Sequence, residues 1–492
     1  MKIYLETMGC QMNRLDSELV ISRLRAAGHE MTDDRRSADV VLFNTCSVRR
    51  HAEQKVYSRL GAEGQRKAHN RRLIVGVLGC MAQREGEQLL RDYPQVDIVC
   101  SPGQLARLAE LVEHVAGGGG AVLAMDPDRR TQRSKDAEKS LAAELAPRSA
   151  GERPAAAELA SRSAGERPAA AEEFDALDLS RDPSQSPSFS QAFVRVARGC
   201  DKFCTYCIVP FVRGPEVSRA PQRIVDEVRR LVEAGRSEIT LLGQTVNSYR
   251  WSDGGRSVNF ADLLGRLAAV GGLRRLRFVT SHPLDFGDDI LQAMRDLPNV
   301  CPYIHCPAQS GSDAVLRRMN RKYTRAQYDD LVDRARTIVP DVVLAGDFIV
   351  GFPGESEEDH AASAQLIRRS GYKNSFIFKY SPRPGTAAAR MHDDVPAEVK
   401  RRRNNELLDV QAEVGLAHHR SYIGRTVEVL VEGPSPRAAK QPTPAPPGQT
   451  QMLGRTRGDH IVVFDGPPAL AGQYISVRIV DASALTLMGI VD

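Results

Sequence analysis

The sequence predicts an α/β protein with three parts: an N-terminal parallel-sheet domain, a central partial barrel of six strand–helix units, and a small C-terminal all-β barrel. Three observations predict this fold. Residues 1–125 alternate short apolar runs with polar helical stretches, residues 191–420 repeat that alternation on a larger scale, and residues 421–492 are rich in strands with glycine turns. Alternating strand and helix signals indicate a parallel sheet covered by helices. Short strands joined by glycine turns are typical of a small barrel.

The N-terminal domain is predicted from three apolar runs at 3–5, 40–43 and 73–78, each followed by a cysteine and then by a polar helical stretch. Between this domain and the next, residues 126–190 change in composition to Ala, Arg, Glu, Ser and Pro. An 11-residue unit, RSAGERPAAAE, begins at Arg148 and recurs from Arg162. This segment lacks the large apolar residues that a core needs, so we predict a disordered linker.

The central part carries six short apolar runs separated by helical patterns, which fits a six-stranded partial barrel. A doubly wound open sheet is the competing fold. The predicted strands are 193–197, 238–243, 276–280, 303–306, 344–350 and 375–380, and the predicted helices are 222–234, 262–269, 289–296, 325–338 and 357–369.

The C-terminal part follows a basic helical stretch near residues 400–403 and is predicted to hold strands at 427–431, 460–464 and 474–479. A proline-rich loop at 433–448 interrupts them.

Composition narrows the class of protein. No run of about 18 apolar residues occurs, so we expect no transmembrane helix, and the chain begins directly with a strand pattern, so we expect no signal segment and a cytoplasmic protein. The net charge of +5 permits a nucleic-acid partner without arguing for one. Nine cysteines, an odd number, point to metal ligands or buried thiols rather than a disulfide framework.

Three of these cysteines, Cys200, Cys204 and Cys207, lie in one short stretch with C-x3-C-x2-C spacing. A structural zinc site uses four ligands, and an ordinary four-iron, four-sulfur cluster uses four cysteines. Three thiolates leave one iron free to bind a substrate or a second cofactor. Positive charge from nearby arginine and lysine would favour the thiolate form; the candidates are Arg198, Lys202 and Arg213. Solvated surface charge is the alternative interpretation of these three residues.

A second set of three is spread along the N-terminal domain, where Cys10, Cys46 and Cys80 each end an apolar run. The carboxyl ends of parallel strands lie on one edge of the sheet, where open α/β folds bind ligands. We therefore expect these three thiols to meet and to hold a second cluster with an open iron. The other three cysteines, Cys100, Cys301 and Cys306, are predicted to be small core residues.

The cysteine loop after the first barrel strand resembles that of the radical S-adenosylmethionine (SAM) enzymes, and the two triads together resemble the methylthiotransferases of that superfamily. Those enzymes combine an N-terminal domain bearing the separated cysteine triad, a radical SAM barrel and a C-terminal TRAM barrel. The stretches that carry the resemblance are GCQMNRLDSE (9–18), NTCSVR (44–49), GCDKFCTYCIVPFVRG (199–214), DFIVGFPGE (347–355) and YSPRPGT (380–386).

The resemblance implies SAM and two 4Fe-4S clusters as cofactors. One cluster, on Cys200, Cys204 and Cys207, would cleave SAM, and the other would carry the sulfur to be transferred. The protein's part would be to aim the radical and exclude water. No side chain is predicted to be catalytic. Residues expected to bind SAM lie in turns on the C-terminal rim of the barrel: Gln244, Asn247, Ser281, Gln309, Asp347, Gly351 and Glu355.

The residues after Cys10 and Cys46 resemble the branch of the family that methylthiolates C2 of N6-isopentenyladenosine, next to the anticodon of tRNA. The implied partners are the tRNA anticodon stem-loop and an electron donor such as flavodoxin or ferredoxin. Two other targets stay open: threonylcarbamoyl-adenosine in tRNA and a ribosomal protein. A two-cluster electron-transfer or scaffold protein is the alternative from another class.

Overall fold

The computed structural model describes residues 1–47, 50–127, 177–183, 188, 190–253, 255–438 and 446–491. Most of the predicted linker and part of the proline-rich loop lie outside the described residues. The chain divides into two compact units. The first comprises residues 1–185, 198–201 and 208–219, and the second comprises 186–197, 202–207 and 220–492.

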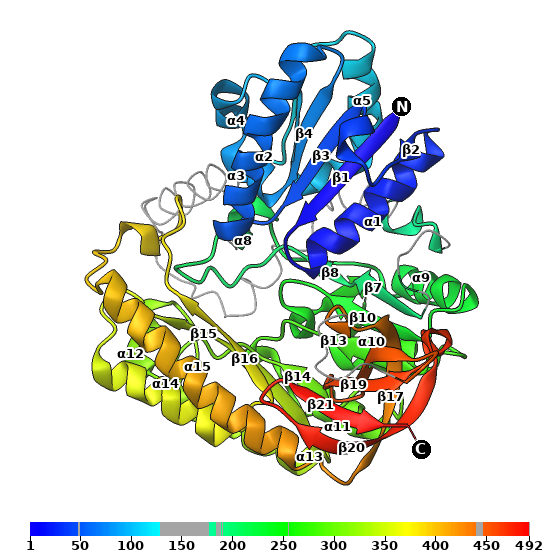
Figure 1. The fold of residues 1–492 in the computed structure, drawn as a ribbon. Helices are drawn as coiled ribbons and strands as arrows, with labels where there is room; N and C mark the ends of the chain where they lie inside the picture. Colours follow the sequence, from blue (N-terminus) through cyan, green and yellow to red (C-terminus); the bar gives the residue numbers. More distant parts are fainter. Residues whose placement is uncertain are drawn as a thin grey trace. The chain divides into compact units, whose positions relative to one another are not determined.

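The first unit is built on a six-stranded parallel sheet in the order β2-β1-β3-β4-β5-β6 (Figure 1). Every residue of β3 and β4 is buried, as expected when helices cover both faces of a parallel sheet. The strands are β1 (Lys2–Met8), β2 (Glu30–Met31), β3 (Val40–Thr45), β4 (Ile74–Gly79), β5 (Ile98–Cys100) and β6 (Val122–Ala124). The helices are α1 (Gln11–Ala26), α2 (Arg50–His69), α3 (Cys80–Glu85), α4 (Glu87–Asp92), α5 (Leu108–Ala116) and α8 (Val209–Val212).

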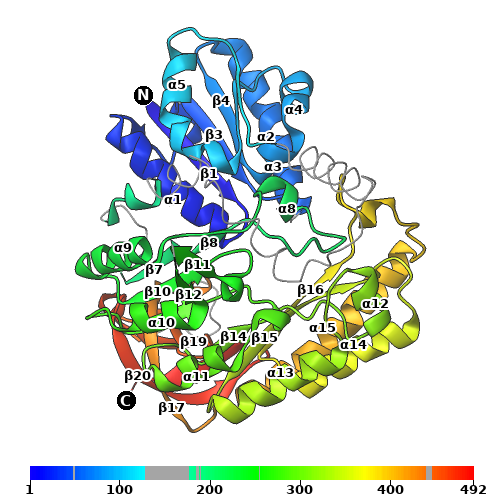
Figure 2. The same ribbon diagram turned by 180° about the vertical axis from the view of Figure 1, so that it is seen from behind.

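The second unit begins with six parallel strands in chain order (labelled in Figure 1, and seen from behind in Figure 2). They form two three-stranded sheets, β7-β10-β13 and β14-β15-β16, and a parallel bridge from Leu276 to Val300 continues the first toward the second. The strands are β7 (Gln191–Arg195), β10 (Glu238–Leu242), β13 (Arg275–Phe278), β14 (Tyr303–His305), β15 (Val343–Val350) and β16 (Asn374–Lys379). Because a doubly wound sheet would reverse its strand order, the sequential order confirms the partial barrel and excludes the competing fold.

Helices follow the barrel strands close to where the sequence predicts them: α9 (Pro221–Glu233), α10 (Phe260–Ala268), α11 (Asp288–Asp296), α13 (Arg325–Ile338) and α14 (Glu357–Ser370). The predicted capping residue of α14 is Ser356. Its hydroxyl oxygen accepts from the Asp359 N–H, and the Asp359 carboxylate accepts from the Ser356 N–H. Between the barrel strands, helix α12 (Asp313–Arg318) and the hairpin of β11 (Arg250–Asp253) and β12 (Arg256–Asn259) were not predicted.

The long helix α15 (Ala397–Arg420), which contains the predicted basic stretch, leads into a closed barrel of order β17-β18-β19-β21-β20. Its strands are β17 (Thr426–Pro434), β18 (Thr450–Thr456), β19 (Ile461–Gly466), β20 (Tyr474–Ala482) and β21 (Thr486–Ile490). Strands β17, β19 and β20 are predicted from the sequence, whereas β18 and β21 are not. Each of the missed strands has a glycine in its interior, which weakens a strand pattern.

Two very short strands, β8 (Ala197–Arg198) and β9 (Val217–Ser218), flank the loop that carries the C-x3-C-x2-C stretch. The boundary between the two units runs through this loop, since Cys200 belongs to the first unit and Cys204 and Cys207 belong to the second.

Candidate functional site

The first cysteine triad lies at the point where the strand order of the N-terminal sheet reverses. Strand β1 sits between β2 and β3, so the crevice at the carboxyl ends of β1 and β3 is where an open α/β sheet binds ligands. Met8, Thr45 and Gly79 stand side by side in register across β1, β3 and β4. The cysteines follow these three positions by one or two residues, so the register of three strands brings Cys10, Cys46 and Cys80 to one edge.

A buried pair of asparagines holds the strand ends together beneath these cysteines. Asn13 Nδ2 donates to Asn44 Oδ1 at 3.0 Å, and Asn44 Nδ2 donates to the Asn13 carbonyl at 3.0 Å. Asn13 Oδ1 also lies 3.2 Å from Cys10 Sγ. Gly79 has a φ of +88°, and a Cβ there would lie 2.5 Å from Asn44 Oδ1. Only glycine fits this turn, so the residue before Cys80 is dictated by the asparagine pair.

The three sulfurs act on one another electrostatically. A hydrogen bond from Cys46 lowers the pKa of Cys10 to about 5, against the effect of burial and with help from the positive charge of Arg213. Burial raises the pKa of Cys80, which also feels the charge of Cys10. Cys46 and Cys80 are buried and Cys10 is partly exposed. The triad therefore has one thiol already disposed to ionise, which is the form that binds iron.

Arg213, at the C-terminal end of α8, serves this first triad. Its Nε donates to Cys80 Sγ at 3.2 Å and its Nη2 forms a buried ion pair with Asp16 at 2.9 Å. Ile208 and Val212 pack with Cys80 in one small apolar cluster. From the sequence, Arg213 is expected to place its charge near the C-x3-C-x2-C triad; in the structure its side chain donates to Cys80 and Asp16 of the first unit.

In the second unit, the loop around Cys204 and Cys207 is held by the end of helix α12. The Thr205 N–H donates to the Met319 carbonyl at 3.0 Å, and Asn320 Nδ2 donates to the Phe203 carbonyl at 2.9 Å. Phe203 has a φ of +47°, a left-handed conformation uncommon outside glycine. The Cys207 N–H donates to the Cys204 carbonyl at 3.0 Å, which closes the turn between these two cysteines.

Arg321 is the cation beside Cys204, and sequence reasoning missed it. Its Nη1 lies 3.5 Å from Cys204 Sγ, while its other nitrogens donate to the Pro307 carbonyl at 3.0 Å and the Tyr323 hydroxyl at 3.1 Å. Arg321 is buried and lies more than a hundred residues along the chain from Cys204. The predicted cation Lys202 instead pairs with Asp285 at 2.6 Å. The role suggested for Arg198 stays a prediction.

The rim turns of the barrel are joined to one another in strand order. Asn247 Nδ2 donates to the His282 carbonyl and its Oδ1 accepts from the His282 N–H, both at 2.8 Å. The Ser281 N–H donates to the His305 carbonyl, and the Gln309 N–H donates to the Asp347 carbonyl. Asn247, Ser281, Gln309 and Asp347 therefore lie along one continuous rim.

Within that rim, some predicted SAM-binding side chains keep hydrogen-bonding capacity and others do not. Gln244 Oε1 and Ser281 Oγ are buried with no hydrogen-bond partner in the described part of the chain, as expected of groups that await a polar ligand. In Asn247, both the side-chain nitrogen and the side-chain oxygen are hydrogen-bonded to the backbone of His282. Asp347 Oδ1 lies 3.1 Å from His305 Nε2.

Gly351 and Glu355 lie in the loop after β15 and fix its position. Glu355 Oε1 accepts from the Gly351 N–H at 2.9 Å and from Arg403 Nη1 at 2.8 Å. A Cβ on Gly351, whose φ is +67°, would collide with the Lys400 side chain. These contacts anchor the loop after β15 to helix α15, so both residues shape the rim.

The donor chemistry of each triad fits iron, because cysteine thiolates are the ligands of iron–sulfur clusters. Among the residues that the structure describes, no three His, Cys, Asp or Glu side chains converge closely enough to hold one metal ion. In a four-iron cluster each thiolate binds a different iron, so three thiols on one edge need not converge on a point. Cys100, Cys301 and Cys306 are buried, and burial raises the pKa of each thiol, which confirms them as core residues.

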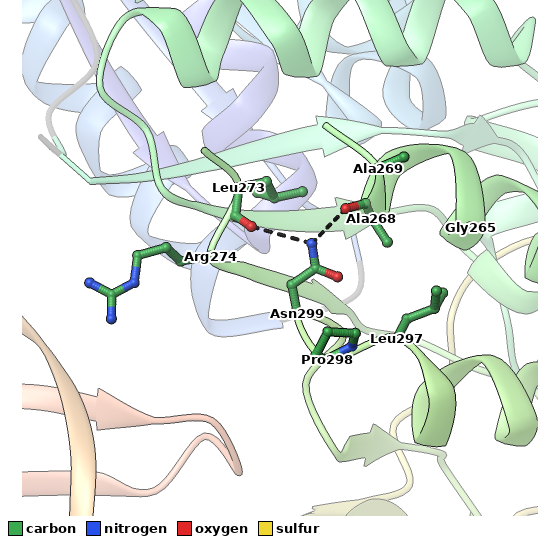
Figure 3. A pocket seen from close by; sticks show the side chains of 8 residues that line it. All are labelled: Gly265, Ala268, Ala269, Leu273, Arg274, Leu297, Pro298 and Asn299. Carbon is green, nitrogen blue, oxygen red and sulfur yellow. Dashed lines mark hydrogen bonds between the residues drawn. The ribbon is translucent and has the colours of Figure 1, made fainter. Parts of the chain in front are cut away.

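A surface hollow of about 490 Å³ lies at the opposite end of the barrel (Figure 3). It lies where α10 and α11 end and β13 begins, and Asn299 closes its floor by donating to the Ala268 and Leu273 carbonyls. Residues at the N-terminal ends of barrel strands serve stability rather than chemistry, so this hollow is not the candidate site.

Comparison with known proteins agrees with this architecture. The Uncharacterized protein family UPF0004 matches residues 2–101, the Radical SAM superfamily matches 194–367, and the TRAM domain matches 420–491. A solved radical S-adenosylmethionine methyltransferase, TsrM from Kitasatospora setae with cobalamin and a [4Fe-4S] cluster bound, has a similar fold. Its TM-score is 0.50 at 16% identity, covering 79% of this chain and 76% of that one. Fold and site together define a radical SAM enzyme.

Curated relatives give the family. The tRNA-2-methylthio-N(6)-dimethylallyladenosine synthase of Rhodopirellula baltica is 47% identical over 99% of this chain and 95% of its own length. The protein of that name from Syntrophotalea carbinolica is 39% identical over 97% of this chain and 96% of its own. The chain belongs to the methylthiotransferase family of radical SAM enzymes, which excludes the electron-transfer and scaffold alternative. Membership implies the use of SAM and a 4Fe-4S cluster.

No helix in the described residues is both long and apolar enough to span a membrane.

Proposed function

We propose that this enzyme adds a methylthio group to C2 of N6-isopentenyladenosine, at the adenosine next to the anticodon of tRNA, with two 4Fe-4S clusters in a cytoplasmic protein. The observation that carries the proposal is the meeting of Cys10, Cys46 and Cys80 at the switch point of the N-terminal sheet, in a chain that also has a radical SAM barrel. The names of the full-length relatives support the choice of nucleoside.

In this proposal each triad holds one cluster with an open iron. The clusters and SAM supply the radical chemistry and the sulfur. The chain supplies the thiolates and a buried arginine beside each set: Arg213 for Cys80 and Arg321 for Cys204. Hydrogen bonds to cluster sulfurs are one of the means by which proteins tune cluster potentials.

The rim of the barrel is the proposed SAM site. Gln244 and Ser281, with buried oxygens that lack partners among the described residues, are the groups we assign to direct contact with SAM. Asn247, Gln309, Gly351 and Glu355 hold the turns in place through the contacts above. Asp347 lies beside His305.

The RNA partner is the tRNA anticodon stem-loop, and the reductant is a small electron-transfer protein such as flavodoxin or ferredoxin. Sequence-specific RNA recognition acts on unstacked bases of single-stranded loops. The target adenine therefore has to leave its stack to reach the barrel.

Nucleoside analysis of tRNA tests the target. A strain that lacks this gene should lose 2-methylthio-isopentenyladenosine and regain it when the gene is restored. If that nucleoside persists while the methylthio form of threonylcarbamoyl-adenosine or of a ribosomal protein disappears, the target is one of those two.

Iron analysis tests the cofactor count. Anaerobically reconstituted protein should hold about eight irons per chain, four for each of two cubanes. About four irons would contradict the second cluster.

A further inference from the structure

The last strand of the partial barrel, β16, carries two exposed aromatic side chains. Phe376 is 53% exposed and Phe378 is 45% exposed. No other phenylalanine in the part of the chain that the structure describes is exposed. The two rings are nearly parallel, with an interplanar angle of 15° and centroids 6.4 Å apart. Contiguous exposed apolar side chains, unlike scattered ones, are a mark of interaction sites, and these two rings adjoin.

The strand register shows which face these rings occupy. Ile377, between them, packs into the core with residues of α15, and α14 and α15 lie together along that side of β15 and β16 in both views (Figure 1, Figure 2). Successive side chains of a strand point to opposite faces. Phe376 and Phe378 therefore point away from the helices, into the barrel interior.

The neighbours of the rings on the interior face belong to the candidate site. Phe376 is in register with Asp347, and Phe378 is in register with the half-buried Ile349. The ring of His305 meets Phe376 edge to face, with centroids 6.5 Å apart, and its Nε2 contacts Asp347. The rings of Phe376 and Phe378 and the side chain of Ile349 thus lie beside a polar pair, His305 and Asp347, on the proposed SAM rim.

We propose that Phe376 and Phe378 form the subsite that receives the unstacked purine base of the RNA substrate. This inference rests on the proposed function and names the residues that would recognise the base. A flat ring face suits stacking on a purine. The apolar surface continued by Ile349 suits the dimethylallyl group, which the substrate adenine carries and SAM lacks. The polar pair of Asp347 and His305 lies where the edge of a stacked base would need hydrogen-bonding groups.

The test uses the full-length reconstituted protein and two anticodon stem-loop RNAs that differ only in the dimethylallyl group on the target adenosine. Wild-type protein should bind the dimethylallyl RNA more tightly. Phe376→Ala should weaken that binding about 5- to 150-fold, the usual range for a lost base–aromatic stack, and should reduce the preference between the two RNAs. Phe376→Tyr should retain both because the ring face remains.

The matched control is Leu408→Ala on α15, which removes another exposed apolar side chain, 44% exposed, and should leave RNA affinity unchanged. SAM affinity measured on the same variants separates the two sources of a purine. Phe376→Ala should leave it unchanged, and a loss of SAM affinity with RNA affinity intact would overturn the assignment in favour of the adenine of SAM.

These binding measurements distinguish a wrong nucleoside from a wrong subsite. A wild-type protein that does not distinguish the two RNAs contradicts the proposed nucleoside. A wild-type protein that distinguishes them, with a Phe376→Ala variant that distinguishes them equally well, contradicts this subsite alone.

Discussion

In the first triad the cysteines come from three strand ends spread over some seventy residues, whereas in the second all three come from one short loop. The first set depends on the parallel register of β1, β3 and β4, so its geometry belongs to the sheet. The second set is local in sequence, yet its loop is held by α12 and its charge comes from the distant Arg321. A compact sequence motif therefore does not mean a self-sufficient site.

The two sets share one feature, which is a buried arginine that donates to a cysteine sulfur. Arg213 follows the second motif by only six residues but serves the first triad. Proximity in sequence would assign this arginine to the second triad.

The largest expected effect is on the second triad. Cys204→Ala should abolish release of 5′-deoxyadenosine from SAM, because the proposed SAM-cleaving cluster would lose one of its three ligands. Chromatography of anaerobic reactions with a chemical reductant measures the release. Cys301→Ala, which changes a buried core thiol, should retain it. A fully active Cys204→Ala would end the role given to this triad.

Cys46→Ala should separate the two triads. The variant should still release deoxyadenosine but form no methylthio product, because only the cluster of the N-terminal sheet is lost. Its iron content should fall from about eight to about four per chain. Methylthio product formed at the wild-type rate would contradict the assignment.

Arg321→Met tests whether the remote arginine matters to the local motif. Removing a group that supports a metal ligand commonly costs about 10- to 100-fold in activity or metal affinity, and we expect a loss of that size in deoxyadenosine release. Arg317→Met, at an exposed position on α12, is the matched control. Equal rates for the two variants would show that the contact with Cys204 Sγ is incidental.

Arg213→Met should act on the stability of the first unit. It removes the arginine from the buried ion pair with Asp16, and breaking a buried ion pair from one side costs about 3–5 kcal/mol of unfolding free energy. Chemical denaturation of metal-free protein measures the loss. The double variant Arg213→Met with Asp16→Asn should recover part of it, and a double variant no more stable than the single one would argue against the ion pair as the cause.

The smallest effect is a difference in pH dependence within the first triad. The pKa of Cys10 is lowered to about 5, so its thiolate predominates above that pH and is lost as the pH falls through it. Burial raises the pKa of Cys80, so that thiol stays protonated at neutral pH. In metal-free protein, alkylation followed by peptide mass spectrometry should find Cys10 modified at pH 7 and much less at pH 4, with Cys80 protected at both. Equal labelling of the two would contradict the electrostatic difference.

Much of the fold was predictable from local patterns. The six barrel strands and the five helices between them fall within a few residues of their predicted bounds, because apolar periodicity and capping residues such as Ser356 act over one or two turns. Helix α12 and strands β18 and β21 were not predicted, because they are short or interrupted by glycine. Only packing against neighbouring elements makes them regular.

The sequence by itself determined the two sets of three thiols and the parallel sheet whose strand ends carry three of them. Spacing and periodicity carry that information along the chain. Only the tertiary structure decided that Arg213 reaches Cys80, that Arg321 reaches Cys204, and that Phe376 and Phe378 face the barrel interior. Such pairings depend on which faces meet after the strands and helices have packed, and a long flexible side chain can reach partners that no local pattern records.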